Sequence, residues 1–599
     1  MTQAGTSQSQ LMELVNNAKI RNWQDINELL ERVSEQPFSP SSYNEDDFDK
    51  LIKKGIAFIT YDYGIDGVSI EVAKYAKTLE SIYGNVDNPL PIHFIGGEFK
   101  EKADVVLQPH WNRHVIDQMN GWSKWHHGKW FSKLYYEEMP EDSALSDSVA
   151  REIWQQTVGF IQSLGDYLTR NDLSCLIPVN IPTNPGNFAA MLALCFVTEG
   201  LGTYVISSNH DYYWEGGKHK SERKPHEGKG VRDHFFKNHD NTPFYDLFIK
   251  MYPWNGRRWI QVNINNPQSK KLVKKFGFKP GKVFELGTSI SSKFFEDFTE
   301  NDVMGIRKRM GYIFSDGQEK LKSTSAKSFM GSIDSWMGDQ KPVFIGFNDG
   351  VEVDLSQDHM IYCLQPTRVI GRKRIEKDLQ LLQGLMDYVP FRREFDNDDR
   401  YQLVLHVTGP VPLEHQADLQ RVLKAYKKLC SYIPEDVANR IFLAFSVGNE
   451  EHPCFAEKNL KPLCIEELYR LATVILFPSE TEGRGLPIIE SSAGGIPIIC
   501  SRYFPERVFD EVIGEELAED ERIHYTLFPE DGFTLEFLKQ ACDLMLHQSK
   551  FSNMKQHNKC AVRLRYSHEM VRVKFETFIE TLQRLDFEVD KDEHILIEA

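Results

Sequence analysis

Apolar runs of strand length alternate with helical patterns in the first half of the chain. GIAFITYDYG at residues 55–64 predicts a strand, residues 67–84 predict an amphipathic helix, and PIHFIGG at residues 91–97 predicts a second strand. Further strands with buried character are predicted at residues 173–182 and 203–214 and from Trp259 and Lys282 onward. This order predicts a doubly wound parallel sheet.

The second half of the chain repeats this alternation. Apolar runs separated by helical patterns predict strands at residues 359–371, 401–409, 440–448, 473–479 and 495–501. Parallel strands need crossover connections, which are usually helices, so this half predicts a second parallel α/β domain.

The flanking and connecting segments differ in composition from these two domains. Residues 297–358 are charged, irregular and rich in Ser, Gly and Asp, which indicates an insertion or an interdomain segment. The sequence predicts five parts, namely an N-terminal helical appendage at 1–45, a Rossmann-like domain at 46–296, the segment 297–358, a second Rossmann-like domain at 359–540, and C-terminal helices with an acidic tail at 541–599.

Length and composition indicate a globular protein with a cleft between two domains. The 599 residues exceed what one hydrophobic core usually organises. No run approaches the roughly 18 apolar residues that span a bilayer, so stable membrane insertion is not expected. The N-terminus lacks the basic-then-apolar order of a secretory signal, and the nine cysteines are scattered. These features favour the cytoplasm.

The net charge narrows the class of partner. A formal charge of −17 argues against nucleic acid as the main partner. Any phosphate site must therefore be a local cluster of cations. The sequence leaves the oligomeric state open.

Such a cluster follows the predicted strand that ends at Ile370. The turn GRKRIEKDL there carries four cations, Arg372, Lys373, Arg374 and Lys377. Ligands of open α/β sheets bind beyond the carboxyl ends of the strands, where helix N-termini present free N–H groups. Arginine and lysine at this place suit a diphosphate, above all a leaving phosphate that gains charge during bond cleavage. A solvated basic helix start is the alternative explanation.

A second candidate site is the segment ETEGRGLPIIESSAGG, which also follows a predicted strand. Gly483 and Gly485 allow the backbone to approach a ligand, and a helix is predicted from Leu486. Glu490 lies inside that helix, where its carboxylate can accept two vicinal hydroxyl groups such as those of a ribose. Glu482 lies on the turn, so the two glutamates need not act as an acid–base pair. Helix capping and surface charge are the alternative.

The order of these residues resembles that of the retaining nucleotide-sugar glycosyltransferases of family four (GT4). These enzymes have the GT-B fold, in which two Rossmann-like doubly wound domains face a central cleft. The resemblance implies that Arg372 and Lys377 bind the donor diphosphate during catalysis and that Glu490 binds the nucleotide ribose. It implies a donor-sugar site formed by Glu482, Gly483, Arg484, Gly485 and Leu486. Arg484 stands where the family commonly has an aromatic residue.

Two elements of the first half resemble the same family. DYGIDGVSIEVAKYAKTLE resembles its first strand-to-helix loop, which implies that Gly67 lies at the donor diphosphate and Asp66 on the acceptor side. SSNHDYYWEGGKH resembles its His-Asp element, and the HDxYWE form is similar to a subset that acts on small hydrophilic acceptors. This implies an active-site role for His210 and acceptor-side roles for Asp211 and Trp214. A structural histidine is the alternative.

The run VNIPTNPGN precedes an apolar helix and resembles the same subset. It implies that Asn180 and Asn187 contact the acceptor. Turn-forming asparagine is the alternative. The resemblance covers roughly residues 55–295 and 360–510 and leaves the appendage and the 297–358 segment unexplained.

No metal ion and no cofactor are expected. His452, Cys454 and Cys464 offer soft ligands, but a cysteine ten residues after H-x-C is not an established zinc spacing. The sequence has no P-loop, no GxSxG and no HExxH. In the GT-B enzymes that the chain resembles, protein cations neutralise the leaving group, and the nucleotide sugar is a co-substrate.

The resemblance implies a cytoplasmic, metal-independent hexosyltransferase. It would move a sugar from a nucleoside diphosphate donor to a hydroxyl of a small soluble acceptor with retention, forming an α-glycosidic bond. Both a covalent intermediate on Glu482 and a front-face reaction give retention, and the sequence does not choose between them. Two alternatives stay open: a nucleotide-sugar epimerase of the same fold and a non-catalytic nucleotide-sugar-binding protein.

Overall fold

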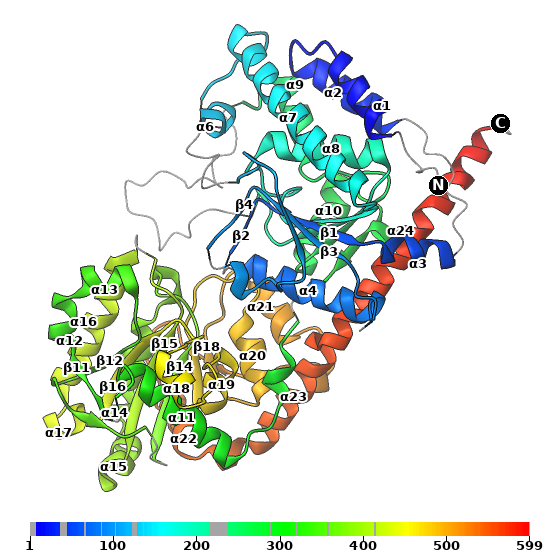
Figure 1. The fold of residues 1–599 in the computed structure, drawn as a ribbon. Coiled ribbons are helices and arrows are strands. Elements are labelled where there is room, and N and C mark those ends of the chain that lie inside the picture. The colour runs from blue at the N-terminus through cyan, green and yellow to red at the C-terminus, as the bar shows by residue number, and fades with distance from the viewer. Residues whose placement is uncertain are drawn as a thin grey trace. The chain divides into compact units, whose positions relative to one another are not determined.

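The structure is a computed structural model that describes residues 7–35, 45–64, 67–85, 87–101, 103–121, 129–135, 137–215, 238–287, 289–318, 320–355, 359–412 and 415–597. Among these residues, contacts gather those before Ile290 and those after Ser567 into a first unit, and those from Ile290 to Ser567 into a second. Each unit is built around its own large sheet (Figure 1).

The first unit contains a seven-stranded sheet in which all neighbouring strands are parallel. In spatial order its strands are β5 (Asn112–Val115), β3 (Ile92–Gly96), β1 (Ile56–Ile59), β6 (Cys175–Pro178), β7 (Tyr204–Asn209), β8 (Trp259–Asn263) and β9 (Val283–Glu285). Side chains alternate between two hydrophobic cores, so that Ala57 of β1 belongs to one and Phe58 to the other. Burial on both faces explains the continuous apolar runs of the central strands.

Helices cover both faces of this sheet. They are α1 (Gln8–Asn17), α2 (Trp23–Ser34), α3 (Glu45–Lys53), α4 (Gly67–Tyr83), α6 (Lys129–Tyr135), α7 (Ala144–Arg170), α8 (Phe188–Leu201), α9 (Thr242–Met251), α10 (Asn266–Phe276) and α24 (His568–Ile597). One core takes side chains from α1, α2, α7, α8 and α9, and the other from α3, α4 and α24. The last helix, α24, therefore completes the first unit, where it packs against α4, β7 and β8 (Figure 1).

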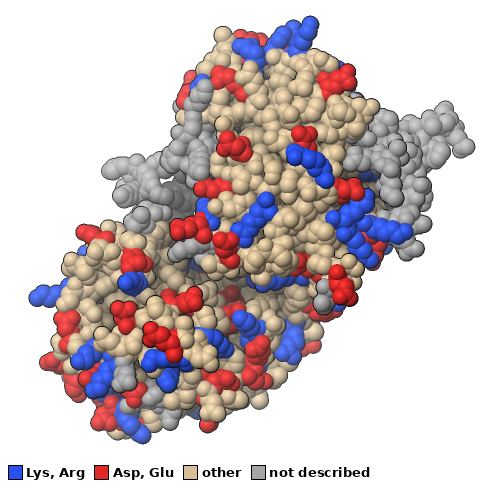
Figure 2. Space-filling view, in the orientation of Figure 1, with Lys and Arg blue, Asp and Glu red and all other residues tan. Residues whose placement is uncertain are grey.

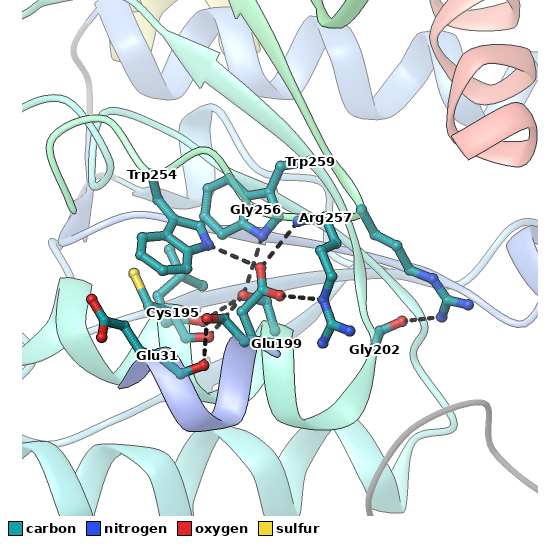
Figure 3. A network of polar contacts seen from close by, with 12 residues as sticks. Glu31, Cys195, Glu199, Gly202, Trp254, Gly256, Arg257 and Trp259 are labelled. Carbon is teal, nitrogen blue, oxygen red and sulfur yellow. Dashed lines mark hydrogen bonds and ion pairs between the residues drawn. The ribbon is translucent and has the colours of Figure 1, made fainter. Parts of the chain in front are cut away.

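A buried carboxylate holds the turn that precedes β8. Glu199 of α8 accepts hydrogen bonds from Trp254 Nε1 at 2.9 Å and from Arg257 Nε at 3.2 Å (Figure 3). Gly256 lies so close that an added Cβ would overlap the Glu199 carboxylate and the Trp259 ring. Glycine is therefore needed there, and the network fixes the start of β8.

The second unit contains an eight-stranded sheet that is parallel except for the pair β12 and β16. In spatial order its strands are β11 (Thr324–Ser325), β12 (Val343–Gly346), β16 (Ile441–Ser446), β15 (Gln402–Thr408), β14 (Met360–Gln365), β17 (Val474–Phe477), β18 (Ile498–Cys500) and β19 (Thr526–Leu527). The five strands predicted in this half are all present, as β14 to β18. Two small sheets pair β2 (Asp62–Tyr63) with β4 (Glu98–Phe99) and β10 (Leu321–Lys322) with β13 (Glu352–Val353).

The described residues of the segment 297–358 form regular helices and strands. They form α11 (Glu300–Phe314), α12 (Ala326–Gly331) and α13 (Ile333–Asp339) as well as β12, which extends the large sheet. Arg309 of α11 donates two hydrogen bonds of 2.9 Å to the buried carboxylate of Glu467. Glu467 belongs to α19 (Ile465–Leu471), so the segment is anchored to a helix of the second unit.

The other helices of the second unit connect its strands or follow the last one. They are α14 (Glu376–Asp387), α15 (Val389–Asn397), α16 (Gln416–Tyr432), α17 (Glu435–Ala438), α18 (Pro453–Glu457), α20 (Leu486–Gly494), α21 (Glu506–Ile513), α22 (Leu535–Leu546) and α23 (Ser552–Tyr566). In Figure 2, side chains of both charge signs are interspersed over the visible face. Within the described ranges, no helix has the length and apolar character needed to cross a membrane.

Candidate functional site

A pocket of about 400 Å³ lies at the carboxyl ends of the strands of the second sheet. Because β14 and β17 are neighbours, the turns that follow them meet there. The pocket is lined by Pro366, Thr367, Arg368, Arg372, Lys373, Thr408, Gly409, Val447, Asn449, Ile465, Glu482, Arg484, Gly485, Leu486, Pro487 and Glu490. The sequence-predicted residues Arg372, Glu482 and Glu490 are thus brought together in one cavity.

The basic turn after β14 and the acidic turn after β17 form one connected structure. The Arg372 carbonyl accepts a hydrogen bond from Glu480 N at 2.9 Å. Arg372 Nη1 donates to the Thr481 carbonyl and lies 3.8 Å from Glu482 Oε2. Lys373 Nζ donates to the other carboxylate oxygen, Glu482 Oε1. Two cations therefore flank one carboxylate in the pocket wall.

The glycines after Glu482 have different roles. Gly485 has a φ of +61°, which favours glycine, and an added Cβ would overlap the Tyr503 hydroxyl. Gly483 is exposed, and no atom lies within 4 Å of an added Cβ. Arg484, Gly485 and Leu486 line the pocket, whereas Gly483 does not. Only the second glycine is thus required by the backbone.

Glu490 is held by a neighbouring helix. Its Oε2 accepts a hydrogen bond of 2.6 Å from the hydroxyl of Tyr469, a fully buried residue of α19. A carboxylate fixed in this way loses little conformational freedom when it accepts hydroxyl groups from a ligand. The arrangement fits the ribose-binding role predicted for Glu490.

Tyr469→Phe is expected to weaken binding of a nucleoside diphosphate about tenfold, because a hydrogen bond to a charged group contributes about 1.5 kcal/mol. Isothermal titration with UDP, GDP and ADP measures this difference. Tyr432→Phe, at an exposed tyrosine of α16, is the control. Equal affinities of Tyr469→Phe and wild type would contradict an orienting role for the hydroxyl.

Lys377 lies outside the pocket wall. It belongs to the first turn of α14, and its Nζ lies 3.4 Å from the Glu530 carbonyl. Burial lowers the pKa of Lys377. Of the cations in this basic turn, Arg372 and Lys373 line the pocket wall. Diphosphate binding by Lys377 stays a prediction from the resemblance.

The first unit holds the His-Asp element at the carboxyl end of β7. His210 is buried, and its Nε2 lies 3.2 Å from Ser208 Oγ. Asn180, which follows the neighbouring strand β6, has a φ of +61°. Its Oδ1 accepts hydrogen bonds from the backbone N–H groups of His210 at 2.7 Å and Asp211 at 3.1 Å. Asn180 thus fixes the backbone that presents both residues.

The aromatic part of the HDxYWE element is packed internally. The Trp214 ring stacks on Tyr212 with centroids 4.1 Å apart and on Phe276 with centroids 4.8 Å apart. Lys271 Nζ lies 4.4 Å from the centroid of the Trp214 ring. Glu215 Oε2 accepts a hydrogen bond of 2.9 Å from Tyr212 N. These contacts stabilise the turn and give Trp214 a role in packing.

The other predicted site residues of the first unit are Asn187, Gly67 and Asp66. Asn187 is fully buried, and its Oδ1 caps α8 by accepting a hydrogen bond of 3.1 Å from Ala190 N. Its Nδ2 donates to the Asn120 carbonyl at 3.0 Å, so both ends of the amide are used in packing. Gly67 begins α4, and Asp66 lies outside the described residues.

Comparison with solved structures identifies the architecture. A glycosyltransferase of Rickettsia africae is 12% identical to this chain and aligns with a TM-score of 0.50, over 89% of this chain and 99% of that one. The fold is GT-B. The prediction of two Rossmann-like domains is confirmed.

Two other solved structures align over similar lengths. HepE of Anabaena, determined with UDP and glucose, is 9% identical with a TM-score of 0.48, over 88% of this chain and 99% of that one. Sucrose-phosphate synthase of Thermosynechococcus elongatus is 12% identical with a TM-score of 0.46, over 88% of this chain and 98% of that one. No protein-family model and no curated protein matches the sequence.

Several pocket residues of this GT-B chain were not found by sequence analysis. Arg368 lines the pocket, and Tyr469 holds Glu490 from outside it. Thr408 ends β15, Asn449 follows β16, and both also line the pocket. The rule that ligands bind at carboxyl ends of parallel strands, applied to every predicted strand, points to the last two. The sequence carries no signal for Tyr469, because its role depends on helix packing.

A buried carboxyl group lies behind the basic turn of the GT-B pocket. Asp378 of α14 is fully buried, and its Oδ2 accepts a hydrogen bond of 2.9 Å from Gln365 Nε2. Its Oδ1 has no hydrogen-bond partner among the described residues. Gln365 Oε1 accepts a hydrogen bond of 3.1 Å from the pocket residue Thr367. Burial raises the pKa of Asp378 well above its usual value.

Asp378→Asn is expected to stabilise the protein at neutral pH by on the order of 1 kcal/mol. The native state binds the Asp378 proton more tightly than the unfolded state, so this carboxyl lowers stability as the pH rises above its unfolded pKa of about 4. Asparagine keeps the shape and removes that cost. Urea unfolding of wild type and variant should show a larger gain at pH 8 than at pH 5. A gain that is absent, or larger at pH 5, would contradict this account.

No metal centre is evident in the part of the GT-B chain that the structure describes. There, no group of three or more His, Cys, Asp or Glu side chains is placed to hold an ion. His452 Nδ1 lies 2.9 Å from Cys454 Sγ, and His452 Nε2 lies 3.2 Å from Asp316 Oδ1. The histidine thus links a buried thiol to a surface carboxylate.

Proposed function

We propose that this protein is a retaining glycosyltransferase of the GT4 type. It transfers a hexose from a nucleoside diphosphate sugar to a hydroxyl of a small soluble acceptor, with an α-glycosidic bond as the product. The observation that carries the proposal is the convergence of Arg372, Glu482 and Glu490 in one pocket at the carboxyl ends of adjacent strands.

The pocket supports the binding of a nucleotide-sugar donor. Its volume of about 400 Å³ suits a ligand of this size. Arg368 and Arg372 offer guanidinium groups to the diphosphate, and Glu490 offers a carboxylate to the ribose hydroxyls. Glu482 faces the donor sugar in this proposal. One nucleotide-sugar molecule would thus contact both the cations and the carboxylates of the pocket.

The acceptor side is assigned to the first unit. His210 and Asp211 lie at the end of β7 and are fixed by Asn180. Imidazole and carboxylate groups can bind the hydroxyl groups of a small polar acceptor. Asn187 and Trp214, the other acceptor-side candidates, make packing contacts that hold the neighbouring turns.

The proposed chemistry depends on charge neutralisation. When the bond between the anomeric carbon and the diphosphate breaks, negative charge grows on the leaving phosphate and positive charge on the sugar. Arg372 is placed to stabilise the phosphate, and the Glu482 carboxylate to stabilise the sugar. In the front-face reaction that we favour, the leaving phosphate takes the proton of the acceptor hydroxyl.

Incubation with a panel of nucleotide sugars and acceptors tests the proposal. UDP-glucose, GDP-mannose and ADP-glucose would each be combined with glycerol, glycerate, free hexoses and hexose phosphates. Release of nucleoside diphosphate that depends on the acceptor, together with an α-anomeric proton signal in the product, is the expected result. A β-linked product would contradict retention.

The two alternatives give different outcomes in the same experiment. An isomerised donor without nucleotide release would identify an epimerase. Tight donor binding with neither product would identify a non-catalytic binding protein.

A further inference from the structure

Lys373 is a buried cation in the wall of the pocket. Only 7% of the residue is exposed, and its Nζ lies 5.7 Å from the centroid of the Phe477 ring, at the end of β17. Buried lysine is rare unless it is paired. Among the described residues, the Lys373 ammonium hydrogen-bonds to Glu482 alone. Burial lowers the pKa of Lys373, while the Glu482 carboxylate opposes that shift.

The backbone around Lys373 leaves this pair little freedom. Lys373 ends the short 3₁₀ turn Gly371–Lys373, and the next residue, Arg374, has a φ of +51°. Arg374 is itself tied to Glu480 and Glu376 by ion pairs. The 3₁₀ turn and Arg374 therefore fix the backbone on both sides of Lys373, so that its side chain points toward the acidic turn after β17.

The position of the Glu482 side chain depends on its hydrogen bond with Lys373. Its side chain is only 11% exposed, and its Oε2 lies 3.8 Å from Arg372 Nη1, beyond hydrogen-bond distance. The hydrogen bond from Lys373 is thus the short contact that fixes the carboxylate in the pocket wall. A buried carboxylate without such a partner would turn toward water.

We propose that Lys373 is the positioning residue for the donor sugar: it holds the Glu482 carboxylate where it accepts a hydrogen bond from a sugar hydroxyl. This inference rests on the proposed function, in which Glu482 faces the sugar. Lys373 does not itself bind the diphosphate, because its ammonium group is buried and engaged by Glu482. The phosphates are bound by Arg368 and Arg372.

Binding measurements separate this role from phosphate binding. Lys373→Met keeps the length of the side chain and removes the charge. We expect affinity for UDP, GDP and ADP to stay within about threefold of wild type, whereas affinity for the matching UDP-glucose, GDP-mannose or ADP-glucose falls about tenfold or more. Glu482→Gln should behave in the same way. The double variant should bind the nucleotide sugar no more weakly than the worse single variant, because both substitutions remove the same Lys373–Glu482 pair.

Other outcomes of these measurements would overturn the inference. An equal loss of affinity for the free nucleotide and the nucleotide sugar would assign Lys373 to the phosphates. Additive losses in the double variant would show that the two residues act separately. Lys320→Met breaks a surface pair with Glu352, 2.9 Å long, and is the control for loss of a lysine–glutamate pair.

A crystal structure of Lys373→Met without ligand tests the inference independently of the donor. The expected result is a Glu482 carboxylate that has left the pocket wall. A carboxylate in its original place would overturn the positioning role, whatever the variant binds. If wild type binds none of the nucleotides, the proposed function fails, while this structure still decides whether Lys373 positions Glu482. Should Lys373→Met not fold, the double variant, which buries no unpaired charge, takes its place in the binding measurements, where an equal loss of affinity for free nucleotide and nucleotide sugar would overturn the positioning role.

Discussion

Arg372→Met is expected to lower kcat by about 10²–10³-fold, the largest effect of any single substitution in the donor pocket. The guanidinium lines the pocket and lies beside the carboxylate of Glu482. Methionine cannot stabilise the charge that grows on the departing diphosphate. Initial rates with the donor and acceptor found in the panel measure the change, and nucleotide titration separates binding from turnover.

A matched control is available on the same sheet. Arg400 lies just before β15, at the amino end of the strand and therefore opposite to the pocket, and it pairs with Asp398 at 2.7 Å. Arg400→Met should retain the turnover of wild type. Unchanged turnover in a folded Arg372→Met variant would remove Arg372 from the reaction.

Asn180→Ala is expected to reduce kcat about 10- to 100-fold and to destabilise the first unit by about 2–4 kcal/mol. Alanine removes the acceptor of two backbone N–H groups, the buried one of His210 and the partly buried one of Asp211. It must also adopt the φ of +61°, which asparagine and aspartate tolerate better. Steady-state kinetics and thermal unfolding measure the two effects.

Asn180→Asp tests whether activity requires the side-chain oxygen acceptor at residue 180 or asparagine itself. Aspartate keeps a side-chain oxygen acceptor at the same distance from the backbone. Its turnover should therefore lie much closer to that of wild type than the turnover of the alanine variant. If the two variants are equally impaired, or if neither loses activity, the backbone contact does not position His210 for the reaction.

The central strands of both sheets were predictable because each is buried on both faces. A strand such as β14 appears as a continuous apolar run, with Tyr362 facing one core and Cys363 the other. The edge strands were not predictable in this way. β5 has the polar sequence NRHV and is largely exposed, and β12 joins its sheet antiparallel from a segment of charged composition.

The site was predictable where function depends on local order along the chain. Arg372, Glu482 and Glu490 follow apolar strands at short distances, so their meeting at one end of the sheet could be expected. The burial of Lys373 could not be predicted, since it depends on Phe477 at the end of β17 and on Glu482 in the turn that follows. Likewise, the sequence predicts a turn at Asn180, but it does not show that the Asn180 amide accepts hydrogen bonds from the backbone of His210 and Asp211.

The return of α24 to the first unit has a consequence for synthesis. Val571, Phe575 and Phe578 of this helix belong to the core that also contains β1 and α4. Among the described residues, the second unit is one continuous stretch of chain, and it can fold as soon as its last strand and helices leave the ribosome. The first unit, although it starts the chain, has to wait for the final helix to emerge before that face of its sheet is covered. Truncation after Ser567 would therefore expose the core of the N-terminal sheet and leave the contiguous unit intact.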